Sequence, residues 1–231
     1  MGSGGEPSVR RFISGLVLDR ALSPRERLGS SHVRQLAESI QAGATLPPIV
    51  VERETSRVVD GFHRVEAYRR LRGPEALVEV LEKDYEDEAA LFEDAMRLNS
   101  AHGSRLAPYD QLRCVAIAER LYIDPSRVAR ALSVRASYVG ELKARRMGTE
   151  LSSRAAIPLK RTIEHMRGRA LTREQMQANH KLGGQNQAFY VQQLIILLQN
   201  DLLDTEDEDL MARVGTLKAL LSRVATPEPG G

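Results

Sequence analysis

The chain has 231 residues, enough for two or three domains that each hold a modest core. Its 42% hydrophobic content and formal net charge of +2 are typical of a folded globular protein and exclude an intrinsically disordered chain. No apolar run is long enough to cross a bilayer, and the first residues lack the apolar core of a signal peptide. We therefore expect a cytoplasmic protein with no membrane partner. The single cysteine, Cys114, lies in an apolar pattern that predicts a buried structural thiol.

Positive charge is concentrated in the middle of the chain. Between Gln111 and Arg173 there are 14 Lys and Arg residues against 5 Asp and Glu, a net charge of +9, which leaves −7 for the remainder. A dense positive segment releases counterions when it meets a phosphate backbone, so double-stranded DNA is the expected partner. A solvated basic surface without a ligand is the alternative.

The first elements are predicted from hydrophobic spacing. Residues 1–8 are rich in Gly and Ser, which indicates a disordered start. Alternation predicts a strand over Phe12–Leu18. A helix should follow, capped by Ser30 or Ser31 and ended by Gly43.

An Asp-Gly turn then joins a strand to a helix. The segments LPPIVVERE and RVVD predict two short strands, and the second ends at Asp60. The run GFHRVEAYRRLRG predicts a helix that Gly73 closes, and LVEVLE predicts another strand. The first hundred residues are therefore expected to mix α and β structure.

This strand-to-helix junction is suited to an anion. Gly61 permits a tight turn and close backbone approach, and the following helix start offers free amide groups. His63 and Arg64 add donors that suit phosphate. A turn glycine followed by two solvated basic residues is the alternative.

The order of LAESIQAGATLPPIVV, VVDGFHRVEAYRRLRG, a strand and MRLNSAHGSRLAPYD resembles the ParB and sulfiredoxin-like nucleotide-binding fold. The Asp-Gly-x-His-Arg turn is more similar to sulfiredoxins, free-serine kinases and ParB-related antibiotic-pathway regulators than to chromosomal ParB proteins. The resemblance implies an α+β nucleotide-binding domain over residues 9–105 with CTP or ATP and Mg²⁺ as cofactors. It also implies that Ala67 packs the helix onto the sheet. The residues that it places at the nucleotide phosphates are Gly61, His63, Arg64, Asn99 and His102.

Departures from the family pattern narrow the chemistry. Phe62 stands where sulfiredoxin has its nucleophilic cysteine, which excludes sulfiredoxin activity. Leu98 and Asn99 stand where ParB clamps have a Glu-Asn pair, and His102 stands where the family usually has arginine. Nucleotide binding is therefore better supported than hydrolysis, and weak NTPase activity stays open. For His102, a helix-end histidine satisfied by backbone is the competing interpretation.

From Pro108 onward the pattern predicts only helices. The segment SRVARALSVRASYVGELKARR resembles a helix-turn-helix, with Ser133 at the turn position that favours glycine and a second helix from about Ala136. We expect this all-α domain to span residues 106–157. The positions predicted to pack are Val128, Ala129, Leu132, Val134, Val139 and Leu142.

The second helix of this pair is predicted to enter the major groove. Arg135, Ser137 and Glu141 are candidates for contacts with base edges. A helical hairpin used only for packing is the alternative. The candidates for phosphate contacts are Arg127, Arg130, Lys143, Arg145 and Arg146.

The C-terminal region, residues 158–231, is expected to be helical. A helix should start at Thr172 and end at Gly183 and Gly184. The runs NQAFYVQQLIILLQNDLLD and DLMARVGTLKALLSRV are too apolar to stay uncovered. They could close on the helix-turn-helix or pack against a second subunit, and we favour a homodimer.

These features together predict a ParB-like DNA-binding protein that acts in transcriptional regulation or in plasmid or chromosome partition, with a nucleotide as control. The alternative is a nucleotide-dependent enzyme, either a small-molecule kinase or an NTPase, on the same fold. A nuclease is a weaker alternative because metal-binding carboxylates are not evident. The five histidines match no ligand spacing, so no metal site in the protein is expected.

Overall fold

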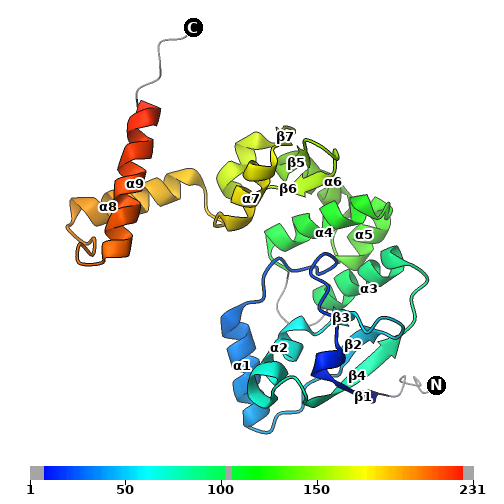
Figure 1. Ribbon diagram of the computed structural model, residues 1–231. Coiled ribbons are helices and arrows are strands. Elements are labelled where there is room, and N and C mark those ends of the chain that lie inside the picture. The colour runs from blue at the N-terminus through cyan, green and yellow to red at the C-terminus, as the bar shows by residue number, and fades with distance from the viewer. Residues whose placement is uncertain (1–7, 102–105, 226–231) are drawn as a thin grey trace. The chain divides into compact units, whose positions relative to one another are not determined.

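Four short strands form a mixed sheet in the first part of the chain: β1 (Val9–Phe12), β2 (Ile49–Glu52), β3 (Val58–Asp60) and β4 (Leu77–Lys83). Their order is β1-β4-β2-β3, and β4 pairs antiparallel with β1 and parallel with β2. The computed structural model describes residues 8–101 and 106–225 (Figure 1). The predicted mixture of α and β structure is confirmed.

Both faces of the sheet are buried, because its β-branched residues alternate. Ile49, Val51 and Val58 pack with Val65 of α2 (Phe62–Arg72) on one face. On the other face, the intervening Val50 and Val59 pack against Leu91 and Ala95 of α3 (Glu88–Ala101). The two faces therefore hold separate cores.

Helix α1 (Ser30–Gln41) packs on α2 rather than on the sheet. Ala67 is fully buried against Val33 and Ile40 of α1, so the expectation that Ala67 faces the sheet is wrong. A small side chain at Ala67 lets the two helices approach closely. Gly43 ends α1 with φ +88°, as predicted.

Two expectations about the first segment are wrong. The predicted strand over Phe12–Leu18 is instead the end of β1 followed by a 3-10 turn, η1 (Ile13–Gly15). Ile13 in this turn and Leu16 directly after it are both buried. Burial at a spacing of three fits a tight helical turn and not an alternating strand. The cap of α1 is Gly29 and no side chain caps it, so neither Ser30 nor Ser31 has the predicted role.

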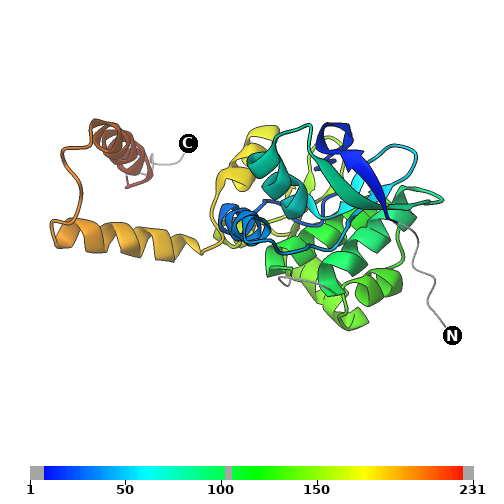
Figure 2. The same cartoon turned by 90° about the horizontal axis from the view of Figure 1, so that it is seen from below.

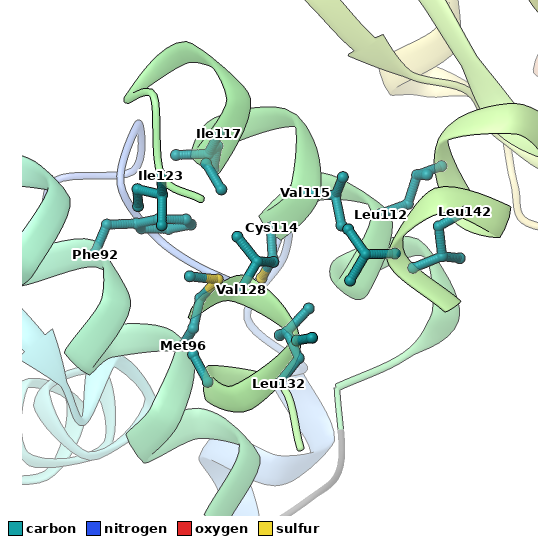
Figure 3. Packing of buried hydrophobic residues seen from close by; sticks show 14 of the residues in the cluster. Phe92, Met96, Leu112, Cys114, Val115, Ile117, Ile123, Val128, Leu132 and Leu142 are labelled. Atoms are coloured by element: carbon teal, nitrogen blue, oxygen red, sulfur yellow. The ribbon is translucent and has the colours of Figure 1, made fainter. Parts of the chain in front are cut away.

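Helices α4 (Pro108–Arg120), α5 (Pro125–Ala131) and α6 (Ala136–Arg146) pack with α3 around a further hydrophobic core. Phe92 and Met96 of α3 enter this core beside Cys114 (Figure 3). Figure 2 shows the green helices gathered beside the sheet. Cys114 is completely buried, its thiol donates to the Pro24 carbonyl at 3.8 Å, and burial raises its pKa. The prediction of a structural thiol is confirmed.

The turn between α5 and α6 is tight. Ser133 has φ +54°, the Ser133 N–H donates to the Arg130 carbonyl, and the Val134 N–H donates to the Ala129 carbonyl. This pair of bonds is the Schellman arrangement, in which glycine is the favoured residue at the position of Ser133. Helix α6 begins at Ala136, as predicted. Of the positions predicted to pack, Val134 is partly buried and the others are buried: Val128, Ala129, Leu132, Val139 and Leu142.

The expectation of only helices after Pro108 is wrong. A three-stranded sheet of order β6-β5-β7 follows α6, and its strands are β5 (Met147–Glu150), β6 (Ala156–Pro158) and β7 (Ala170–Leu171). Strand β6 contains the expected domain boundary between residues 157 and 158. The strands have two to four residues and too little alternation to show in the sequence. Close packing at Gly148 marks the sheet, since a Cβ there would lie 2.6 Å from Leu171. The 3-10 helix η2 (Arg161–Met166) lies between β6 and β7 in the chain.

Helix α7 (Arg173–Lys181) closes this part of the chain. Thr172 and Gln175 form a capping box at its start, as the sequence predicts. The chain divides after Gly184, so that residues 1–184 and 185–231 are two units.

The second unit contains α8 (Gln187–Gln199) and α9 (Glu208–Ala225). Leu202 lies outside α8, although the sequence places it in that helix. No residue of α8 is buried, and a groove of about 350 Å³ runs between the two helices. Among the described residues, no helix is long and apolar enough to cross a membrane.

Ser133→Gly should stabilise the chain. A non-glycine residue in the left-handed region costs about 1–2 kcal/mol, and the chain entropy that glycine adds to the unfolded state costs about 0.5–1 kcal/mol. We expect the free energy of unfolding in urea to rise by up to about 1 kcal/mol. Ser137→Gly, inside α6, is the matched control and should lower it by about 0.5 kcal/mol. Equal destabilisation by both variants would contradict the assigned turn.

Candidate functional site

A pocket of about 780 Å³ lies where the turn between β3 and α2 meets the end of α3. Four of the residues predicted to bind nucleotide, Gly61, His63, Arg64 and Asn99, line it together, although Asn99 is distant in sequence. The fifth, His102, lies outside the described residues. The remaining walls come from α1, the Pro47–Pro48 loop and an irregular segment, residues 23–29, that we call the strap.

Gly61 gives the pocket its turn. It caps α2 with φ +109° and ψ +19°, and no side chain caps the helix there. A Cβ at this position would lie 3.1 Å from the Arg64 guanidinium and would require a conformation that side chains rarely adopt. The first amides of α2, which have no intrahelical acceptors, are therefore available at the pocket.

Arg64 is used to build the pocket wall. Its Nη1 donates to the carbonyls of Pro47 at 2.7 Å and Pro48 at 2.8 Å, and its Nη2 donates to Asp60 at 2.5 Å. The side chain is only 13% exposed. Arg64 thus fastens the proline loop to the end of β3, and these three donors are not directed at a ligand.

His63 is neutral at neutral pH and lies in a positive environment. Its Nε2 accepts the Gly29 N–H at 3.2 Å, and its ring stands edge to face with His32 at 4.9 Å between centroids. Burial, together with the positive charges of His32, Arg25 and Arg20, lowers the His63 pKa to about 4. Burial disfavours a charge of either sign, so it is the nearby Arg25 and Arg20 that favour an anion here.

Two cationic residues of the pocket come from the strap and were not predicted. The Arg25 Nε donates to Asn99 Oδ1 at 3.4 Å, and Asn99 Nδ2 donates to the Ala95 carbonyl in α3. Arg27 also lines the pocket, and its Nη2 donates to the His180 carbonyl at 2.7 Å. The strap is neither helix nor strand, so periodicity could not reveal it. The run SPRERLG, with arginines two apart, was the available signal.

The pocket has an apolar part as well. Leu28, Leu36, Leu46, Phe62 and Leu98 line it beside the cationic residues. Asp60 is the one carboxylate among the described lining residues, and it is paired with Arg64. No group of His, Cys, Asp and Glu in the described part of the chain is arranged to hold a metal ion. The pocket can therefore receive a ligand with an apolar or planar part and an anionic part.

The residues predicted to contact DNA lie on α5 and α6, except Arg135, which is the N-cap of α6. Two of the cations form ion pairs within the chain: Arg127 with Glu93 at 2.6 Å, and Lys143 with Glu119 at 3.1 Å. The side chains of Arg145 and Arg146 lie outside the described part. The candidates that are exposed are Arg127, Arg130, Arg135, Ser137, Glu141 and Lys143.

Comparison with known families identifies part of the chain. Residues 13–95 match the ParB N-terminal domain, and this range includes the strap, α1, the Asp-Gly turn and α2. The resemblance predicted from the sequence motifs is therefore confirmed.

Two curated regulators are similar to the chain. It is 37% identical over 135 residues to the transcriptional regulator NovG of Streptomyces niveus, and the match covers 58% of this chain and 41% of that protein. It is 38% identical over 128 residues to a possible regulatory protein of the streptomycin biosynthesis operon of Streptomyces griseus, covering 55% and 33%. The match thus spans about two fifths of the first regulator and a third of the second.

Solved structures with a similar fold include two of the C-terminally truncated chromosome-partitioning protein ParB from Caulobacter crescentus. The complex with CTP-γ-S is 20% identical with a TM-score of 0.37, and the match covers 59% of this chain and 76% of that one. The complex with the centromeric parS site is 18% identical with a TM-score of 0.43, covering 58% and 70%.

Protonation of His63 should destabilise the fold. Its pKa is about 4 in the folded chain against 6.5 ordinarily, so the unfolded state binds the proton more tightly. The contribution of neutral His63 should be complete above pH 6.5 and should be lost as the pH falls toward 4. His63→Gln keeps an acceptor for the Gly29 N–H but does not titrate in this range.

Thermal unfolding of both proteins from pH 7.5 to 4 measures this effect. The melting temperature of the parent should fall relative to that of His63→Gln across the window from pH 6.5 to 4. A difference between the two proteins that does not change with pH would show that the site does not disfavour protonated His63.

Proposed function

Because residues 13–95 form a ParB N-terminal domain, we propose that this chain is a ParB-like DNA-binding regulator under nucleotide control. One observation carries the proposal. Gly61 and His63 line one pocket together with Asn99, which is distant from them in sequence, and this pocket has both a cationic and an apolar part. Those two chemistries suit the phosphates and the base of a nucleotide such as CTP or ATP.

In the proposed complex, the phosphates lie at the start of α2. The free amides after Gly61 and the guanidinium groups of Arg25 and Arg27 supply the donors. The base rests on the leucine side chains of the pocket and on Phe62. Arg64 acts indirectly, because its donors hold the proline loop in place.

Binding is proposed without rapid hydrolysis. Leu98, which lines the pocket, stands where the resemblance to ParB clamps implies a glutamate, and Asp60 is engaged by Arg64. A Mg²⁺ ion would enter on the phosphates and keep most of its water ligands, as is usual for this ion. The same arrangement disfavours a kinase or NTPase, since no described lining carboxylate is free to act as a base.

DNA binding is assigned to α5 and α6 as a helix-turn-helix. Arg135, Ser137 and Glu141 are exposed at the start and on the open face of α6, where the second helix of such a pair meets base edges. Arg130 and the other cations of the basic segment position the domain on phosphates. The Arg127–Glu93 pair would have to open, or would serve to orient α5.

Residues 185–225 are proposed to form a homodimer contact. Phe189, Val191 and Leu198 of α8 and Leu221 of α9 are all exposed, and α8 is apolar around its circumference. Two copies of the α8–α9 pair could cover one another as a four-helix arrangement. A dimer would also present two copies of α6 to neighbouring half-sites.

The two regulator-named relatives favour transcriptional control over partition as the biological role. A protein with this role would act on DNA in the cytoplasm. Partition of a plasmid or chromosome is the second candidate within the same biochemical function.

DNA affinity should depend on Arg135. A bidentate contact with a base edge contributes about 1–3 kcal/mol, so Arg135→Ala should weaken binding to a selected duplex about 10- to 100-fold. Arg34→Ala, at an exposed position on α1, is the matched control and should leave affinity unchanged. Fluorescence anisotropy across a salt series should show affinity that falls steeply with salt. Binding that ignores both salt and Arg135→Ala would exclude this surface.

Nucleotide affinity should depend on Arg25. A charge-assisted hydrogen bond contributes about 1.5–3 kcal/mol, so Arg25→Ala should weaken CTP or ATP binding at least 10-fold in calorimetric titrations. The Arg34→Ala control should bind like the parent. If Arg25→Ala binds as tightly as the parent, the phosphates lie elsewhere.

A further inference from the structure

The strap connects the pocket to the part of the chain that contains α6. Arg25 and Arg27 line the pocket, whereas the side chain of Glu26, between them, lies outside the pocket and is 13% exposed. Glu26 forms an ion pair with Lys160, whose side chain is 8% exposed. Its backbone N–H donates to Asp110 at the start of α4. On the side away from the pocket, the strap is therefore held by the buried Glu26–Lys160 ion pair.

Lys160 is itself fixed at the junction of β6 and η2. Its backbone N–H donates to Asn179 of α7 at 2.9 Å, and the Asn179 side chain donates to the Pro158 carbonyl at 2.9 Å. The Lys160 ammonium lies 3.7 Å from the centroid of the Tyr109 ring. Asn179 is 1% exposed, so this connection is part of a closed, ordered contact.

The small sheet carries the connection to α6. Strand β5 continues directly from α6, and the Gly168 N–H donates to the Met147 carbonyl at 2.8 Å. Helix α6 also contacts η2. A displacement of Lys160 would therefore also displace the C-terminal end of α6.

A buried ion pair is a poor source of stability but a strong constraint on position. Desolvation offsets most of the attraction between the charges, whereas loss of one partner leaves the other buried and unpaired. Among the described residues, Glu26 Oε1 has no hydrogen-bond partner, and it lies 3.5 Å from His180 Nδ1. The carboxylate is thus only partly satisfied, and a small movement of the strap would change its interactions with both Lys160 and His180.

We propose that Glu26 and Lys160 are positioning residues that couple occupancy of the pocket to the DNA contact made by α6. The inference rests on the proposed function, because the ligand it invokes is the nucleotide. An anion that draws Arg25 and Arg27 toward itself moves the intervening Glu26 relative to Lys160, and the movement reaches α6 through the small sheet. By linkage, DNA must change nucleotide affinity by the same factor as nucleotide changes DNA affinity.

The test is the coupling factor, measured as CTP and ATP affinity with and without a duplex selected on the parent from a random-sequence pool. The variant is Glu26→Gln with Lys160→Met, which leaves no unpaired buried charge and is checked for cooperative unfolding. The matched control is Glu38→Gln with Arg34→Met, which removes an exposed ion pair within α1.

The parent and the control should show a coupling factor of about 5 or more. The Glu26→Gln, Lys160→Met variant should bind nucleotide and DNA separately but with a factor near one. An unchanged factor in that variant overturns the inference and leaves the proposed function intact. A parent that binds both ligands with no coupling overturns the inference and also the nucleotide control in the proposed function, while DNA binding stands. A parent that binds neither nucleotide overturns the proposed function and the inference together.

Discussion

Helix α3 links the sheet to the helices that follow it, because its side chains enter two different hydrophobic cores. Leu91 and Ala95 pack on the sheet, whereas Phe92 and Met96 enter the core of α4, α5 and α6. Truncation of a buried phenylalanine such as Phe92 to alanine typically costs about 3–5 kcal/mol. The last turn of α3 places Asn99 in the pocket. The sheet, the pocket and the helices assigned to DNA therefore cannot be repositioned freely at this boundary.

This constraint is the reason for assigning the proposed coupling between the pocket and α6 to the strap and not to α3. A closely packed helix has few alternative positions, since interiors deform in discrete steps. The strap is held instead by polar contacts: Arg25 with Asn99, Glu26 with Lys160, and Arg27 with the His180 carbonyl. The contacts of Arg25 and Arg27 can be exchanged for others at moderate cost, whereas the buried Glu26–Lys160 pair links a movement of the strap to Lys160. Helix α3 is thus held rigidly by its two cores, whereas the strap beside it can change its polar contacts.

Sequence patterns predicted the elements whose burial has a simple period. Ser133 and the packed positions of α5 and α6 followed from helical spacing, and the Thr172 cap followed from its own motif. The three-stranded sheet was missed because its strands are too short to alternate, and the strap because it has no period at all. Arg64 shows a further limit. Its residue type suits phosphate, but only the folded chain shows that the carbonyls of the proline loop already occupy its donors.

The central claim is that the corner at Gly61 and the strap together hold the phosphates of a nucleotide. A solution NMR titration of the full chain with CTP, and in parallel with ATP, tests it most directly. The largest changes in amide shift are expected in residues 61–64 and in the strap, with the Arg25 side-chain N–H among the shifted signals. Saturable shifts confined to other parts of the chain, or none with either nucleotide, would contradict it.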